Sequence, residues 1–139
     1  MGKADSKIPD RRIHYFFLNP YEDAAFTKCP KCDHKTFIRK FPLVIHIEPR
    51  QIFLLNKKCR YCTKCDLIIT RKSEVESMMA TAFENKRPEI IGNDYLVMGT
   101  LDKSHWRNRK NIAEDSEIIE LMYVFKDVLN FEPVLAWTM

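Results

Sequence analysis

The first half of the chain alternates short apolar runs with turn residues, which is the pattern of β-strands. The predicted strands are residues 13–18, 36–47, 51–60 and 66–70. Glu48-Pro49-Arg50 separates the second strand from the third, and it predicts the turn of a long hairpin. Pro42 lies inside the second strand, and because proline cannot donate a hydrogen bond to a sheet, it predicts an edge or irregular strand there.

Two stretches of the second half carry apolar residues at helical spacing. The first begins with Ser73-Glu74-Val75-Glu76, which fits a capping box with Ser73 at the N-cap and Glu76 at N3. The second is predicted over about residues 116–129. A strand is predicted at 95–101, a loop at 102–111, and a last strand at 133–137. These patterns predict an α+β fold.

The length of 139 residues suits one domain, or one small domain with an appendage. No apolar run approaches the roughly 18 residues that span a membrane. The polar segment from Met1 to Arg12 lacks the apolar region of a secretory signal, so a disordered lead-in and a cytoplasmic location are expected.

Five cysteines in a reducing compartment favour metal binding over disulfides. Two of the Cys-x-x-Cys motifs are Cys29-Pro30-Lys31-Cys32 and Cys62-Thr63-Lys64-Cys65. Four thiolates fill the tetrahedral shell of a structural Zn²⁺ ion. The turn near Pro49 lies close to the middle of the intervening segment, so a strand out and a strand back would bring both motifs to one metal.

Cys59 leaves an alternative, because Cys59 and Cys62 also have Cys-x-x-Cys spacing. The chosen motifs share the pattern C-x-K-C-D, which Cys59-Arg60-Tyr61-Cys62-Thr63 does not. The residue after such a motif often adopts a left-handed backbone, which Asp tolerates better than Thr does. We therefore predict Cys29, Cys32, Cys62 and Cys65 as zinc ligands, with Cys59 as the possible substitute. His34 and His46 are weaker substitutes.

The two motifs and the strands between them resemble the zinc-ribbon superfamily over residues 26–70. The chain as a whole looks like small uncharacterised bacterial zinc-ribbon proteins, although it has Asp where ribbons usually have Gly after each motif. The resemblance implies zinc-ribbon β-hairpins, and the apolar pattern after them predicts a C-terminal two-helix unit with one or two strands. The predicted domains are a lead-in at 1–12, a ribbon domain at 13–72, and a unit at 73–139 packed on it.

Charge divides unevenly along the chain. Residues 1–72 hold 16 Lys and Arg against 7 Asp and Glu, whereas residues 73–139 hold 7 against 12. The basic half predicts an anionic partner, either nucleic acid or an acidic protein. The candidate contacts are Lys35, Arg39, Lys40, Lys57, Lys58, Arg60, Trp106, Arg107 and Arg109. The alternative is that these cations solvate the hairpin and offset the charge of the thiolates.

No phosphate-binding glycine loop, serine elbow or paired-carboxylate motif is evident, which argues against an enzyme without excluding one. We therefore predict a structural zinc module that contacts nucleic acid or a nucleic-acid-handling protein, with no membrane and no small-molecule substrate. One alternative is a protein–protein adaptor that uses the C-terminal helices and the Trp106 loop. Another is a rubredoxin-like electron-transfer protein that holds iron.

Overall fold

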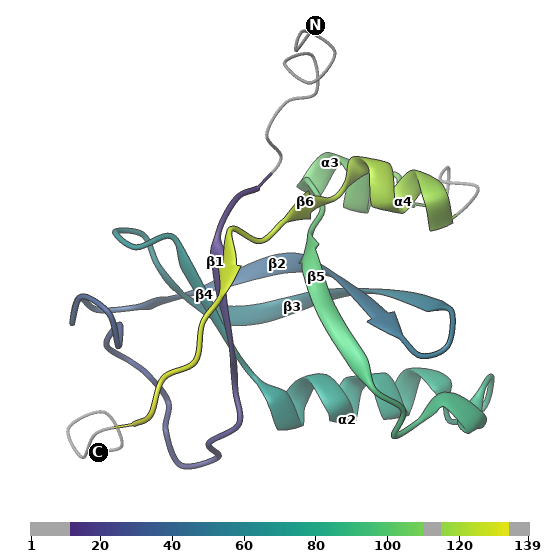
Figure 1. Cartoon of the computed structure of the whole chain (residues 1–139), viewed down its shortest axis with the longest axis horizontal. Coiled ribbons are helices and arrows are strands. Elements are labelled where there is room, and N and C mark those ends of the chain that lie inside the picture. Colours follow the sequence, from purple (N-terminus) through teal and green to yellow (C-terminus); the bar gives the residue numbers. More distant parts are fainter. Residues whose placement is uncertain (1–11, 110–114, 134–139) are drawn as a thin grey trace, which may run out of the picture.

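A single curled sheet of seven strands forms the centre of the computed structural model, which describes residues 12–109 and 115–133 (Figure 1). The strand order is β6-β5-β2-β3-β4-β1-β7. The strands are β1 (Tyr15–Asn19), β2 (Phe37–Ile47), β3 (Gln51–Cys62), β4 (Leu67–Arg71), β5 (Tyr95–Thr100), β6 (Tyr123–Val124) and β7 (Asp127–Val128). The helical elements are α2 (Lys72–Phe83), η1 (Pro88–Ile90), α3 (Lys103–Arg107) and α4 (Asp115–Leu121). The fold is mixed, with strands dominating, as expected of an α+β protein.

The long antiparallel hairpin of β2 and β3 runs through the middle of this sheet, in register from Phe37↔Tyr61 to Ile47↔Gln51. β2 is not an edge strand, because β5 pairs with its other side. In an antiparallel strand, the backbone nitrogen and carbonyl of one residue point toward the same neighbouring strand. The Pro42 carbonyl points toward the end of β5, where it accepts a hydrogen bond from the Leu101 N–H. The missing donor of Pro42 therefore lies on the β5 side, where strand pairing begins only at the next residue. A register shift between Val44 and Ile45 makes that side irregular, as the proline predicts.

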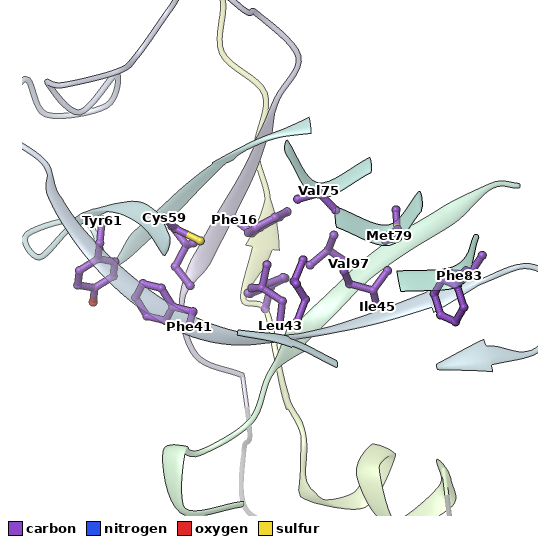
Figure 2. Close-up of a cluster of buried hydrophobic side chains, with 14 of the residues drawn as sticks. Phe16, Phe41, Leu43, Ile45, Cys59, Tyr61, Val75, Met79, Phe83 and Val97 are labelled. Atoms are coloured by element: carbon purple, nitrogen blue, oxygen red, sulfur yellow. The ribbon is translucent and has the colours of Figure 1, made fainter. Parts of the chain in front are cut away.

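The sheet is covered on both faces. Leu43 and Ile45 point toward Val75, Met79 and Phe83 of α2, in the core cluster drawn in Figure 2. Val44, one residue out of phase, packs on the opposite face with Ile118 and Met122, at and just after α4. The alternation along β2 thus gives each helix a separate apolar layer. Within the described residues, no helix is long and apolar enough to cross a membrane.

The start of α2 differs from the capping-box prediction. Arg71 occupies the N-cap with extended geometry, no side chain caps the helix, and Ser73 lies inside the first turn. The reason is that β4 passes directly into α2 without a loop, so the N-cap falls on the last strand residue.

The second predicted helix is wrong beyond Leu121, where α4 ends. Backbone N–H groups after it donate to the sheet instead: Phe125 to Met98, Lys126 to His14, and Leu129 to Phe16. These N–H groups therefore bond to carbonyls of distant residues instead of to carbonyls four residues earlier, as a helix would require. The expected loop at 102–111 contains the short helix α3. Residues 134–137 of the last predicted strand lie outside the described part of the chain.

Strands from both predicted domains belong to the same sheet. β5 pairs with β2, and β7 pairs with β1 in parallel. The domain boundary at residue 72 stays a prediction, but residues on either side of it share hydrogen bonds and core.

We predict that Gly99→Ala destabilises the protein by about 3 kcal/mol, near the upper end of overpacking costs. A Cβ at this position would lie 2.1 Å from the Tyr123 carbonyl oxygen, so β5 and β6 would have to separate. Chemical denaturation measures the loss. Gly92→Ala is the control, because its Cβ meets nothing within 4 Å and only its φ of 89° is unfavourable. A smaller cost at Gly99 than at Gly92 would contradict the prediction.

Candidate metal centre

Two tight turns bring the four predicted cysteine ligands to one place. The first knuckle (residues 29–33) lies between β1 and β2, where Cys29 N–H donates to the His34 carbonyl and Asp33 N–H donates to the Cys29 carbonyl. The second knuckle (residues 62–66) connects β3 to β4, whose antiparallel pairing ends at Cys62↔Leu67. The β2–β3 hairpin returns the chain to its start, as the spacing of the motifs predicts.

Each knuckle ends in a left-handed aspartate. The φ angle is 65° at Asp33 and 55° at Asp66, which confirms the backbone expected at both positions. Asp pays less for this conformation than most residues do, so it can stand where zinc ribbons usually have Gly.

The four thiols have the spacing of a metal site. The sulfur atoms of Cys29, Cys32, Cys62 and Cys65 all lie within 4.8 Å of one another. The sulfurs of Cys32 and Cys62 are 3.5 Å apart. A tetrahedron with Zn–S bonds of about 2.3 Å separates its sulfurs by about 3.8 Å, so the cluster could hold a metal ion with little movement. In residues 12–109 and 115–133, no other group of three or more His, Cys, Asp or Glu side chains lies close enough together to hold a metal ion.

Cys59 lies outside this cluster. It is three residues before Cys62 within β3, and an odd spacing places the two side chains on opposite faces of the sheet. Figure 2 shows it in the apolar core near Phe16 and Tyr61. Its thiol donates to the Lys57 carbonyl at 3.3 Å, and burial raises its pKa to about 11. A neutral core thiol is the role that this position supports.

Backbone amides support ionised sulfur in both knuckles. Lys31 N–H donates to the Cys29 sulfur and Cys65 N–H to the Cys62 sulfur, each at 3.4 Å. Burial nevertheless raises the pKa of Cys29 to about 12. Burial also opposes ionisation of Cys32, but a backbone hydrogen bond at His34 and bonds with the neighbouring thiols lower its pKa to about 6.

The Asp66 carboxylate is the centre of a hydrogen-bond network that the sequence did not predict. His14 donates to it twice, from Nδ1 to Oδ1 at 2.5 Å and from the backbone N–H to Oδ2 at 3.1 Å. The Tyr61 hydroxyl donates to Oδ1 at 2.6 Å, and Lys126 lies 3.4 Å from Oδ2. Burial would raise the pKa of Asp66, but the bonds from Tyr61 and His14 outweigh it and lower the pKa. His14 and Asp66 are 52 positions apart in the sequence, and nothing in the sequence signals their contact.

The predicted basic contacts divide into three groups. Those on or beside the hairpin that line surface hollows are Arg39, Lys40, Lys57, Lys58 and Arg60. Lys35 lies at the first knuckle, in an isolated bridge with Lys28. The third group is in and just after α3, where the Arg109 guanidinium lies 3.8 Å from the centre of the Trp106 ring and Arg107 is exposed.

A basic groove lies between the β2–β3 hairpin and the first half of α2. Its volume is about 1020 Å³, and Lys40, Lys58, Ser77 and Met78 are among the residues that line it. A smaller hollow of about 320 Å³, bordered by Lys58, Arg60 and Arg71, lies where β4 diverges from β3. Lys58 lines both, so the two form a continuous basic region.

Lys57 is not available to a partner. Its side chain is 6% exposed, and its ammonium group donates to Glu74 at 2.6 Å and to the Lys58 carbonyl at 2.7 Å. Position 57 faces the core side of β3, as Cys59 does, so its charge is neutralised by α2.

Comparisons of the chain with protein-family models, with curated proteins and with solved structures find no match. The zinc-ribbon likeness consequently rests on the two knuckles and the hairpin between them. The four-cysteine geometry indicates a metal-binding module.

Proposed function

We propose that this chain is a non-catalytic module, held together by one structural Zn²⁺ ion, that binds nucleic acid along the basic groove. Cys29, Cys32, Cys62 and Cys65 would be the ligands. Four soft thiolates suit Zn²⁺ or iron, and a closed shell of four leaves no open position for catalysis. One zinc per chain by metal analysis is the expected result, and a red iron-containing protein would favour electron transfer instead.

The observation that carries the nucleic-acid proposal is a pair of like charges. Lys40 and Lys58 lie directly opposite each other on β2 and β3. Like charges at such a position destabilise a sheet, so a polyanion that neutralises both would remove a cost already present in the free protein.

The surrounding cations are also unpaired. Those of the basic region are Lys40, Lys58, Arg60 and Arg71. None of them forms an ion pair with a carboxylate among the described residues. Glu74, the acidic residue that lines the groove, is occupied by Lys57. Phosphates are the natural partners of such a surface, because cations that neutralise them release bound counterions.

Exposed apolar side chains favour a single strand over a duplex. Phe37 and Ile38 are 53% and 57% exposed at the start of β2, beside these cations. Such side chains can contact unpaired bases, which every single strand offers regardless of sequence.

We expect the double variant Lys40→Ala/Lys58→Ala to weaken binding of single-stranded oligonucleotides at least about tenfold. It should also flatten the plot of log affinity against log salt by about 1–2 units, because about two phosphate contacts are lost. Fluorescence anisotropy over a salt series measures both quantities.

The same variant should be no less stable than the parent, because the repulsion between the two lysines is removed. Arg107→Ala/Arg109→Ala is the matched control, since it removes two exposed cations near α3. Equal losses from the two double variants would indicate non-specific attraction, and no binding at low salt would refute the proposal. Salt-insensitive binding of a protein that needs Trp106 would favour the adaptor alternative.

A further inference from the structure

A second basic pocket adjoins the groove. It lies where the start of β1, the middle of β2, the end of β5 and the start of α3 meet, and its volume is about 260 Å³. His14, Arg39, Lys40 and Lys103 line it, and Asp102 is the acidic residue of the lining. Lys40 also lines the basic groove, so the two hollows adjoin at this residue.

The cations of this pocket are uncompensated. Among the described residues, no carboxylate forms an ion pair with Arg39, Lys40 or Lys103. The lining carries three cations and one carboxylate, that of Asp102. Arg39 and Lys40 are neighbours on β2, so their side chains leave opposite faces of the strand, and Lys103 comes from α3. A pocket of this kind attracts anions, and it is small enough to enclose a single group.

Arg39 is held in place before any ligand arrives. Its guanidinium carbon lies 5.0 Å from the centre of the Phe41 ring and 5.2 Å from that of Tyr61. Among the described residues no carboxylate forms an ion pair with Arg39, so its N–H donors are available to a ligand. A planar fork of donors fixed by aromatic rings suits bidentate recognition of phosphate.

His14 is held from the other side. Asp66 accepts from its Nδ1 and from its backbone N–H, and its ring packs edge-on against Phe41 and Tyr61. With Nδ1–H donating to Asp66, Nε2 is the acceptor nitrogen of the neutral ring, and the ring forms part of the wall of the pocket. The φ of 68° at His14 indicates that this placement is maintained against a local backbone cost.

We propose that this pocket binds a phosphate monoester. Such a group carries a charge near −2 and three strong acceptor oxygens at neutral pH, which matches the guanidinium of Arg39 together with the ammonium groups of the lining. An internal phosphodiester carries one charge and needs room for chain on both sides. Because the pocket shares Lys40 with the groove, the monoester is the terminal phosphate of a strand that lies in the groove. This last step rests on the proposed function.

The test compares single-stranded oligonucleotides of one sequence that carry a 5′-phosphate, a 3′-phosphate or neither. We expect one phosphorylated form to bind about tenfold more tightly than the unphosphorylated form at moderate salt. Arg39→Ala and Lys103→Ala, which alter exposed side chains, should each remove most of that preference. Lys58→Ala is the matched control, because it should weaken all three oligonucleotides equally and leave the preference intact.

Three outcomes decide between the ideas. Equal binding of all three oligonucleotides, or a preference that survives Arg39→Ala, would overturn the pocket proposal while leaving nucleic-acid binding in place. If no oligonucleotide binds, the proposed function fails, and NMR titration with inorganic phosphate and a 5′-mononucleotide then tests the pocket alone. Shifts of the His14 ring and Arg39 signals would support a site for a small phosphorylated molecule, and their absence would refute it.

Discussion

Cys62→Ser and Cys65→Ser should each remove stoichiometric metal binding and unfold much of the protein. Each change leaves three thiols in a cluster whose sulfurs now lie within 4.8 Å of one another. Structural zinc contributes about 10–16 kcal/mol to folding in small zinc-finger peptides, which exceeds the total stability of many domains. Metal analysis of the purified variants and their circular dichroism should show loss of zinc together with loss of structure.

Cys59→Ser is the control for this result. Its thiol faces the core on the other side of β3 and donates to the Lys57 carbonyl, a bond that a hydroxyl can also make. We expect one metal per chain and a cost of about 1–2 kcal/mol from burying a more polar group. Metal loss in Cys59→Ser with retention in Cys65→Ser would reverse the ligand assignment.

Chelation should reproduce the serine variants. A strong chelator added to the parent protein should lower its melting temperature by tens of degrees, because the two knuckles would lose their cross-link. An unchanged melting temperature would mean that the sheet alone supports the fold.

The cysteine cluster could be predicted because its geometry is set locally. Two residues between cysteines, a following Asp that tolerates positive φ, and a turn midway along the hairpin are all visible in the sequence. Cys59 could be set aside in the sequence because the repeated C-x-K-C-D pattern excludes it. The structure adds that strand alternation places Cys59 and Cys62 on opposite faces of the sheet.

The remaining features depend on partners far away in the chain. The 3.6-residue pattern after Leu121 was real, but Met122 and Phe125 pack into different clusters on opposite sides of the sheet. A helix would have placed them on one face. The sequence likewise predicted Lys57 to be an exposed cation. Nothing near it in the sequence shows that α2 places Glu74 beside its ammonium group.

Asp66→Ala should destabilise the protein by about 3 kcal/mol, a large effect for a residue that is not a metal ligand. It removes the acceptor for His14 Nδ1, the His14 N–H and the Tyr61 hydroxyl, and the side chain that Lys126 approaches. Hydrogen bonds to a charged group contribute about 1.5–3 kcal/mol each, and the partial exposure of Asp66 reduces their sum. Chemical denaturation of the zinc-loaded protein measures the change.

Asp33→Ala supplies the matched control. Asp33 holds the same position in the first knuckle with nearly the same positive φ, but it is exposed and no such network surrounds its carboxylate. Its loss should therefore cost only the backbone preference, about 1 kcal/mol. Tyr61→Phe removes a single bond and should cost a similar amount.

The difference in unfolding free energy between Asp66→Ala and Asp33→Ala measures how much the Asp66 hydrogen-bond network contributes to stability. If both cost the same, the Asp66 network contributes nothing and His14 is placed by packing alone. If Asp66→Ala costs about 2 kcal/mol more, the second knuckle is tied through Asp66 to β1 and to the segment before β7. Those contacts join the four-cysteine cluster to both predicted parts of the chain, so a bound metal would stabilise the whole sheet rather than the hairpin alone.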